Sequence, residues 1–370
     1  MKKAQQGLSF IDKIFLWINI FLCAALLLSY LAPITDPAKY WFIAFFGLAY
    51  PILLIANLLM AVYWLLRKKL WILLPLISIV IGWGILNKNI GLRRSSVYSP
   101  QPGNVRVMTY NVHNFKKYGS NNDVTTKQEI LAIIAAEQPD ILGIQEFYTR
   151  RHGEYDMVDS ILKIMNTTSY YFEVFQSSAR ESLGMAIFSK FPIIDHGLVQ
   201  LSDKLNENQC LYVDVKKGTQ TFRLYSVQLR SIHFDPYDYQ YLNHVSSEGK
   251  ADMGSTKRLG SKLKDAFIRR SAQVFKVKDD AAKCPYPYII SGDFNDTPTS
   301  FAVNELSKGL KNTFCEKGSG FGRTYNGAFP NYQIDYILAG KQFDVASYEI
   351  IEKKLSDHYP VRSDLVLKVN

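Results

Sequence analysis

The chain has 370 residues, 48% of them hydrophobic, and a formal net charge of +10. Residues 1–104 hold ten basic and two acidic side chains, so the rest of the chain has an excess of only two positive charges. The basic excess therefore flanks apolar segments, where it meets anionic lipid headgroups, and does not by itself indicate a polyanionic partner. The four cysteines lack metal-ligand spacing, which argues against a thiolate zinc site or a disulfide framework.

Three long apolar runs occupy the first 88 residues and predict a membrane domain. They cover about residues 14–32, 40–66 and 70–87, and roughly 20 apolar residues in a helix are enough to cross a bilayer. Core helices of a soluble protein would show a polar face, and a cleaved signal peptide would not be followed by two further runs. We therefore expect three transmembrane helices.

Basic residues around these runs predict an orientation. The first run follows Lys2, Lys3 and Lys13, and the turn between the second and third runs is Arg67-Lys68-Lys69. The positive-inside rule places both segments in the cytoplasm. Three crossings then leave the C-terminal domain outside it, in an integral protein of the cell (inner) membrane. Basic residues after the third run oppose this orientation: Lys88, Arg93 and Arg94.

A linker over residues 89–104, containing Pro100 and Pro102, separates the membrane domain from a domain at 105–370. Helices are expected at 256–280 and 300–308. Many short β-branched or aromatic runs predict strands, and strands that outnumber helices indicate an α/β fold with two packed sheets and outer helices. The strand candidates are 105–112, 140–146, 170–175, 185–189, 211–215, 221–229, 288–291, 334–338 and 361–367.

Polar side chains stand at the ends of these strands, where apolar residues would be the default. Each alone is an ordinary turn or surface residue. Burying such groups is costly unless they are paired or bind an ion, so several of them together indicate one shared polar pocket. They are Asn111, Glu146, Asp293, Asn295, Asp335, Asp357 and His358.

The set resembles the endonuclease/exonuclease/phosphatase superfamily, which includes deoxyribonuclease, exonuclease III and sphingomyelinases. The resemblance runs in the family's order over almost all of residues 105–370. It implies a four-layer α/β sandwich, two packed mixed sheets flanked by helices, and the hydrolysis of a phosphate ester with Mg²⁺, or alternatively Mn²⁺. The matching pieces are Thr109-Tyr110-Asn111, Gln145-Glu146, Gly292-Asp293-Phe294-Asn295, Ile334-Asp335-Tyr336 and Ser356-Asp357-His358.

Carboxylate oxygens suit a hard cation such as Mg²⁺, which keeps several of its waters. Glu146 is the expected direct ligand, with Asn111 and Asp357 on the metal side. A bound metal would polarise the phosphoryl oxygen and neutralise charge that builds up in the transition state.

The remaining residues are expected to perform the proton transfer and hold the phosphate. Asp335 would orient the His358 ring and favour its protonated form, and Asp293 would orient or deprotonate the attacking water. Whether Asp293 or His358 takes the proton stays open. Asn295, Asn111 and His358 would contact the phosphate.

One position departs from the family pattern. Where members often carry a strand-end histidine, this chain has Ser226-Val227-Gln228-Leu229. Gln228 is expected to bind the phosphate, although an amide cannot donate a proton as an imidazolium does. The polar, aromatic stretch that follows, residues 231–259, is expected at the rim of the pocket, either as a lid that contacts substrate or as a surface insertion.

We therefore expect a metal-dependent hydrolase of phosphoester bonds, and favour a nuclease-like phosphodiesterase. A lipid-headgroup phosphodiesterase and a small-molecule phosphatase are the alternatives, because the near-neutral domain shows no charge suited to a nucleic-acid backbone. The second alternative is an inactive, membrane-tethered binding module. The expected partners are the phosphoester substrate and the lipid membrane, and no protein partner is inferred.

Overall fold

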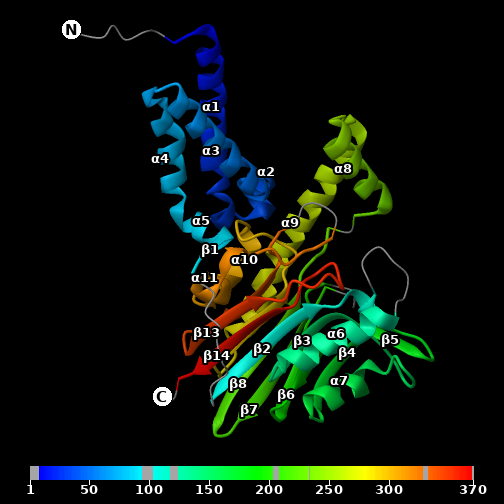
Figure 1. The fold of residues 1–370 in the computed structure, drawn as a ribbon. Helices are drawn as coiled ribbons and strands as arrows, with labels where there is room; N and C mark the ends of the chain where they lie inside the picture. The colour runs from blue at the N-terminus through cyan, green and yellow to red at the C-terminus, as the bar shows by residue number, and fades with distance from the viewer. Residues whose placement is uncertain are drawn as a thin grey trace.

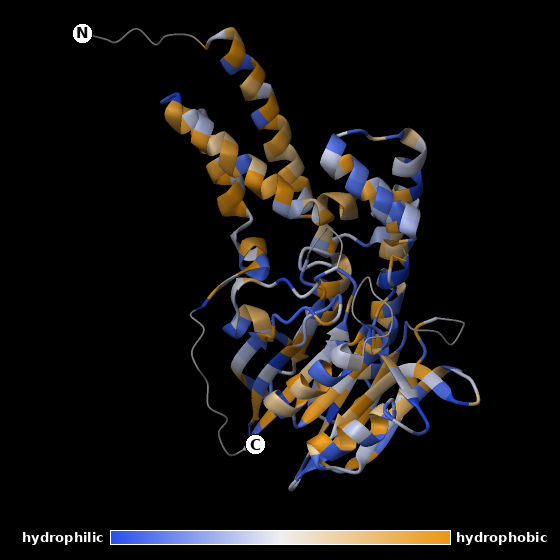
Figure 2. Ribbon diagram, turned by 45° about the vertical axis from the view of Figure 1, so that its right-hand side comes forward, coloured by the Kyte–Doolittle hydropathy of each residue, from blue (hydrophilic) through white to orange (hydrophobic). Residues whose placement is uncertain are grey.

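A computed structural model describes residues 8–93, 103–116, 124–202, 208–232, 234–327 and 332–368. A bundle of N-terminal helices stands on a domain built from two sheets (Figure 1). A hairpin of α8 (Pro236–Glu248) and α9 (Met253–Ala281) rises from the domain beside the bundle. Hydrophobic residues dominate the bundle, whereas the hairpin is largely hydrophilic (Figure 2).

The bundle contains one straight apolar segment and two bent ones. Phe10–Ile34, which includes α1, is long and apolar enough to cross a membrane. The second and third expected spans are each broken, by bends of 48° and 65°, so the structure offers one span, or up to three if each bent pair crosses as a unit. The helices are α1 (Phe10–Ser29), α2 (Pro37–Leu48), α3 (Tyr50–Leu66), α4 (Leu73–Ile81) and α5 (Trp83–Asn89).

The breaks have local causes that the length of an apolar run does not reveal. Pro51 lies in the first turn of α3 and has no N–H to donate to the preceding turn, so the helix restarts after Ala49. Gly82 separates α4 from α5 and leaves the backbone free to turn. The three crossings therefore stay a prediction, with one continuous segment and two that would each cross as a bent pair.

Lys13 and the Arg67-Lys68-Lys69 turn, which flank the first and second apolar segments, lie at the same end of the N-terminal bundle. Arg67 Nη2 is 2.8 Å from Asp12 Oδ2, and Tyr63 donates a hydrogen bond of 2.8 Å to Asp12 Oδ1. Asp12 opens α1 and Arg67 ends α3. This arrangement agrees with the expectation that Lys13 and the Arg67-Lys68-Lys69 turn share one side of a membrane.

The C-terminal domain contains two six-stranded mixed sheets. The first has the order β13-β14-β2-β3-β5-β4, with β2 and β3 parallel, and the second has the order β10-β12-β9-β8-β7-β6, with β8 and β9 parallel. The first consists of β2 (Asn104–Asn111), β3 (Ile141–Arg150), β4 (Ser169–Ser177), β5 (Glu181–Ser189), β13 (Phe343–Ile350) and β14 (Val361–Leu367). The second consists of β6 (Ile193–Val199), β7 (Cys210–Lys217), β8 (Gln220–Gln228), β9 (Tyr288–Asp293), β10 (Lys311–Asn312) and β12 (Asp335–Ala339).

The sheets pack face to face and helices cover both outer faces, which confirms the four-layer α/β sandwich. Fully buried residues from both sheets, such as Val107 and Leu224, form the central core. A second core joins the first sheet to α6 (Val124–Glu137) and α7 (Met157–Met165). A third joins the second sheet to α9 and α10 (Phe301–Ser307). Each layer thus buries its apolar face against the next.

The N-terminal bundle is docked on this domain through α2 and α9. The Phe45 and Phe267 rings meet edge to face at 5.4 Å, and Ser271 donates a hydrogen bond of 2.6 Å to Asp36. The first residues of the expected linker form β1 (Ile90–Leu92), which pairs with β11 (Ser319–Phe321). Part of the linker is therefore a strand, while its residues 94–102 lie outside the described residues.

Candidate active site

The two parallel strand pairs bring polar side chains from both sheets to one edge of the sandwich. Asn111 ends β2, Gln228 ends β8 and Asp293 ends β9, while Glu146 lies within β3. Asn111 Nδ2 donates to Asp293 Oδ2 at 3.2 Å, a hydrogen bond that joins one sheet to the other. The convergence expected from strand ends is thus present in the fold.

Glu146 is presented by a bulge, not by the end of its strand. β3 continues to Arg150, and its register against β5 shifts between Ile144 and Phe147. Glu146 has a φ of +52°, which costs a non-glycine residue conformational energy and is typical of functional positions. Its Oε1 accepts hydrogen bonds from Asn111 Nδ2 at 3.0 Å and Gln228 Nε2 at 3.1 Å. The two amides therefore hold the carboxylate in place through this one oxygen.

Further contacts show how the Asn111 and Gln228 amides are oriented. The Asn111 oxygen accepts from the His113 backbone N–H at 3.1 Å, so its nitrogen faces the carboxylates. Gln228 is 2% exposed, and its Oε1 has no hydrogen-bond partner among the described residues. In this geometry both residues hold Glu146, while the metal and phosphate contacts expected of Asn111 and the phosphate contact expected of Gln228 stay predictions.

Asp293 is buried at the centre of the site. Its Oδ1 accepts from the Asn295 backbone N–H at 2.8 Å and its Oδ2 from the Asn295 side chain at 3.0 Å. Burial outweighs the attraction of His358 and raises the pKa of the Asp293 carboxyl to about 7. A carboxyl with such a pKa can accept a proton near neutral pH, as a general base must.

His358 is held in a buried imidazole–carboxylate pair. Its Nδ1 lies 3.0 Å from Asp335 Oδ2, and its Nε2 lies 3.8 Å from Asp293 Oδ2. Burial favours the neutral ring, but the carboxylates of Asp335 and Asp293 outweigh burial and hold the pKa of His358 well above its usual value. The ring is oriented through Nδ1, so Nε2 is the nitrogen that faces the cavity side.

His113 is a site residue that sequence reasoning missed. Its Nδ1 lies 3.5 Å from Glu146 Oε2 and 3.7 Å from Asp357 Oδ1, so one imidazole and two carboxylates, all of which can bind a metal ion, lie close together. Contact with Glu146, opposed by burial, raises the pKa of His113. Three successive positive φ angles, from His113 to Phe115, turn the chain here. The signal in the sequence was weak: a histidine two residues after a strand-end asparagine.

A cavity of about 440 Å³ opens over these groups. Its lining includes five of the predicted residues, which are Glu146, Asp293, Asn295, Asp357 and His358. The other three, which are Asn111, Gln228 and Asp335, are hydrogen-bonded to members of that set. All eight predicted side chains thus belong to one connected cluster.

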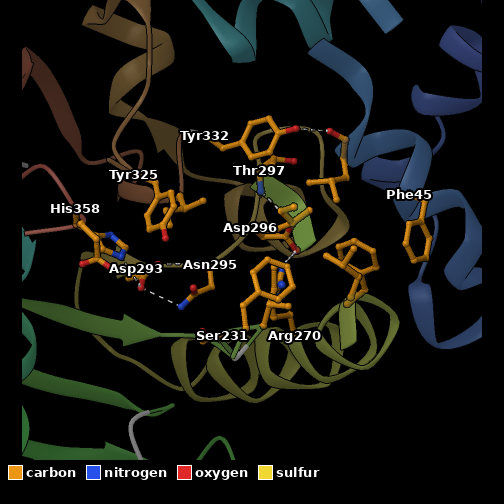
Figure 3. A pocket seen from close by; sticks show the side chains of 18 of the residues that line it. Phe45, Ser231, Arg270, Asp293, Asn295, Asp296, Thr297, Tyr325, Tyr332 and His358 are labelled. Atoms are coloured by element: carbon orange, nitrogen blue, oxygen red, sulfur yellow. Dashed lines mark hydrogen bonds and ion pairs between the residues drawn. The ribbon is translucent and has the colours of Figure 1, made fainter. Parts of the chain in front are cut away.

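The far part of the cavity was not foreseen. Figure 3 shows His358, Asp293 and Asn295 at one end, Asp296 and Thr297 in the middle, and Phe45 of α2 at the other end. Arg270 of α9, 1% exposed, is fixed by an ion pair of 2.7 Å with Asp296 Oδ2. Nothing in the sequence marked this arginine, because its position depends on how α9 packs on the second sheet.

The residues present fit a divalent cation. Both amide contacts are made to Glu146 Oε1, whereas Oε2 lies near His113, which is also close to Asp357, and carboxylates are the ligands that Mg²⁺ prefers. A second group, Asp293, Asp335 and His358, also has ligand atoms within 4.8 Å of one another. We favour the Glu146 side, because His358 Nδ1 is already engaged with Asp335.

Comparisons with known proteins agree with this geometry. The model of the endonuclease/exonuclease/phosphatase family matches residues 108–358, and a domain of unknown function (DUF8431) matches residues 12–89. A search among curated proteins found no match.

Solved structures of low identity share the fold. A family protein from Bacteroides vulgatus is 17% identical, with a TM-score of 0.52 over 72% of this chain and 99% of its own. One from Beutenbergia cavernae is 20% identical, with a TM-score of 0.50 over 71% and 72%. The human Nocturnin catalytic domain is 15% identical, with a TM-score of 0.50 over 73% and 97%. The family match covers more than half of the chain, and this protein therefore belongs to the endonuclease/exonuclease/phosphatase family.

Proposed function

We propose that the protein is a divalent-metal-dependent hydrolase of phosphoester bonds, anchored in a membrane. Family membership supports phosphoester hydrolysis in general, and the finer proposal rests on one observation. Side chains from both sheets meet in a single cavity that holds a carboxylate cluster, a buried carboxyl with a pKa near neutrality and an oriented imidazole. These are the groups that phosphoryl transfer to water requires.

Each residue of the metal side has a role in this proposal. Glu146 and Asp357 hold the cation, and Asn111 and Gln228 fix the Glu146 carboxylate through their amide N–H groups. Mg²⁺ or Mn²⁺, when bound, neutralises charge on the phosphoryl oxygens. Hydrogen-bonded supports of this kind typically alter metal affinity by one or two orders of magnitude.

The remaining residues act on water and phosphate. The oxygen of a water molecule bonds to phosphorus as the ester P–O bond breaks, one proton leaves the water and the departing alcohol gains one. Asp293 or His358 takes the proton from water, Asp335 keeps the His358 ring oriented, and Asn295 with His358 holds the phosphate. Whichever of the two takes the proton from water, the other in its protonated form gives one to the departing alcohol, and the raised pKa of His358 favours it as that acid and Asp293 as the base.

A panel of phosphoesters tests this function on the full chain in detergent. DNA, RNA, sphingomyelin, inositol phosphates and a chromogenic diester are assayed with Mg²⁺, with Mn²⁺ and with a chelator, beside Asp293→Ala. We expect hydrolysis of at least one ester that the chelator and the variant both abolish. Activity that survives both would refute the mechanism, and no hydrolysis of any member would favour the inactive binding module. Hydrolysis of DNA or RNA would support the nuclease-like reading.

Membrane placement is part of the same proposal. We infer that the chain spans a cell (inner) membrane three times, with the catalytic domain outside the cytoplasm, from the apolar segments and the clustered basic residues. An alkaline-phosphatase reporter fused after Asn104 should be active. A silent reporter, together with an active cytoplasmic reporter at the same position, would reverse the orientation.

A further inference from the structure

The active-site cavity has a wall supplied by the membrane bundle. Phe45 and Leu48 of α2, and Ala49 and Ile52 at the bend into α3, line the same cavity as the catalytic side chains. Tyr332, also in the lining, donates a hydrogen bond of 3.1 Å to the Leu48 carbonyl and so ties the catalytic domain to this bend. The cavity is therefore completed only where the two parts of the chain meet.

The lining changes character along its length. Across from α2, the α8–α9 hairpin and the segment before it add apolar side chains, which are Ile232, Phe234, Leu242, Leu263 and Phe267. The carboxylate and imidazole groups occupy the opposite end (Figure 3). Among the described lining residues, Arg270 is the one guanidinium or ammonium group, and it is paired with Asp296. A nucleic-acid backbone needs a row of cations, which this wall does not offer.

Two hydrogen-bond donors lie between the catalytic end and the apolar end of the cavity. Arg270 Nη2 and Thr297 Oγ1 are buried and lack a hydrogen-bond partner among the described residues, although both side chains line the cavity. The Arg270 guanidinium cannot swing away, because it also donates to the Arg230 carbonyl at 2.9 Å. Leaving such donors unpaired is costly, so an acceptor on a ligand would be favoured at this point.

The apolar end continues onto the outside of the bundle. Ile52 lines the cavity and is also 57% exposed. The exposed side chains that follow along α3 recur at helical spacing and form one stripe: Ile55, Leu59, Val62 and Leu66. A helix rises about 1.5 Å per residue, so the stripe runs for roughly 20 Å, most of the thickness of a hydrocarbon core.

From this arrangement we propose that the substrate is a membrane amphiphile that carries a phosphoester headgroup. The proposal rests on the phosphoesterase function above and names its substrate class. The phosphoester binds at Glu146, Asp293 and His358, and an acceptor group next to it binds Arg270 and Thr297. The hydrocarbon chain passes the apolar lining side chain of α8, leaves the cavity beside Ile52 and lies along the α3 stripe, so that the substrate need not leave the bilayer completely.

The experiment compares two phospholipids that share one headgroup and differ by two methylene groups in acyl length, both monomeric in water below their critical micelle concentrations, with the full chain held in amphipol and with Mg²⁺. We expect kcat/KM to be at least tenfold higher for the long-chain lipid, since burying about two additional methylene groups supplies that factor. A chromogenic diester assayed in parallel reports the chemistry alone.

Two variants on α8 sharpen the comparison. Leu242→Trp fills the apolar part of the cavity and should lower the long-chain to short-chain ratio at least fivefold. Tyr237→Trp introduces the same residue on the exposed side of that helix and should leave the ratio unchanged.

A third variant tests the contact next to the phosphoester. Thr297→Val, which removes only the unpaired hydroxyl, should raise KM for the lipids severalfold with little change in kcat.

The outcomes separate this inference from the function it rests on. Hydrolysis of the chromogenic diester with equal kcat/KM for the two lipids would overturn the amphiphile and leave the phosphoesterase standing. Faster hydrolysis of DNA or RNA than of any lipid would overturn it in the same way. Failure to hydrolyse every ester, the chromogenic diester included, would overturn both.

Discussion

Replacing Asp293 by Asn should make the stability of the metal-free protein less sensitive to pH while abolishing activity. The folded state raises the pKa of this carboxyl from 3.8 to about 7, so it keeps a proton that the unfolded chain has already lost. Raising the pH between these values therefore favours unfolding of the wild type, by about 1.4 kcal/mol per pH unit. Asparagine does not titrate, so the free energy of unfolding of the variant does not fall with rising pH in this way.

The size of the effect follows from the same pKa. Between pH 5 and pH 7 the stability of Asp293→Asn relative to wild type should rise by about 2 kcal/mol and then approach a plateau. Both Asp293 oxygens accept hydrogen bonds from N–H groups, so the asparagine turns its NH₂ group towards a donor and loses a contact at every pH, which leaves the pH-dependent part of the difference unchanged. In a domain of this size the pH-dependent change corresponds to roughly 4–8 °C in melting temperature.

The assay is thermal unfolding of the full chain in detergent with a chelator, at pH 5, 6, 7 and 8. Asn295→Ala is the matched control, because it removes a side chain bonded to Asp293 but keeps the titrating carboxyl. Its pH dependence should follow that of the wild type. A difference between Asp293→Asn and wild type that stays constant from pH 5 to pH 8 would refute the assignment of a raised pKa to Asp293.

Three further substitutions, and a fourth that serves as a control, test the metal side and the backbone that supports it. Glu146→Gln should lower kcat by at least about a hundredfold and weaken activation by Mg²⁺ in a metal titration of the initial rate. Gln228→Leu should raise the Mg²⁺ concentration needed for half activation by about 10–100-fold, with kcat largely restored at saturation. An unchanged Mg²⁺ requirement would remove Gln228 from the metal site. Gly292→Ala should lower the free energy of unfolding by about 3 kcal/mol or more, because its new Cβ would lie 2.0 Å from the Val227 carbonyl oxygen at a φ of +139°. Gly309→Ala, at φ +81° with no atom within 4 Å, should cost only about 1 kcal/mol.

The sequence predicted those features that depend on local pattern. Asn111 and Asp293 could be placed because each follows a short β-branched strand, and the structure ends β2 and β9 at these residues. The strand expected over 361–367 has these bounds in the structure. The strands β6 and β13 were missed. In β6, which is Ile193–Val199, the residues Asp195, His196 and Gly197 weaken the strand signal.

Features that depend on packing between distant segments could not be read from the chain. The bulge at Glu146 arises from the register of β3 against β5, and the part played by Arg270 depends on the docking of α9. The apolar wall of the cavity depends on how α2 meets the catalytic domain. The segment 231–259 was expected at the rim, and Phe234 and Leu242 do line the cavity, but its helical hairpin was not foreseen.

The location of a bound cation tests the central claim most directly. A crystal or cryo-EM structure of the full chain with Mn²⁺ would provide it, with an anomalous signal in the crystal case. We predict an ion about 2.1 Å from a Glu146 carboxylate oxygen, on the side that faces Asp357. An ion bound instead among Asp293, Asp335 and His358, or no ion at Glu146 under conditions where the enzyme turns over, would contradict the account.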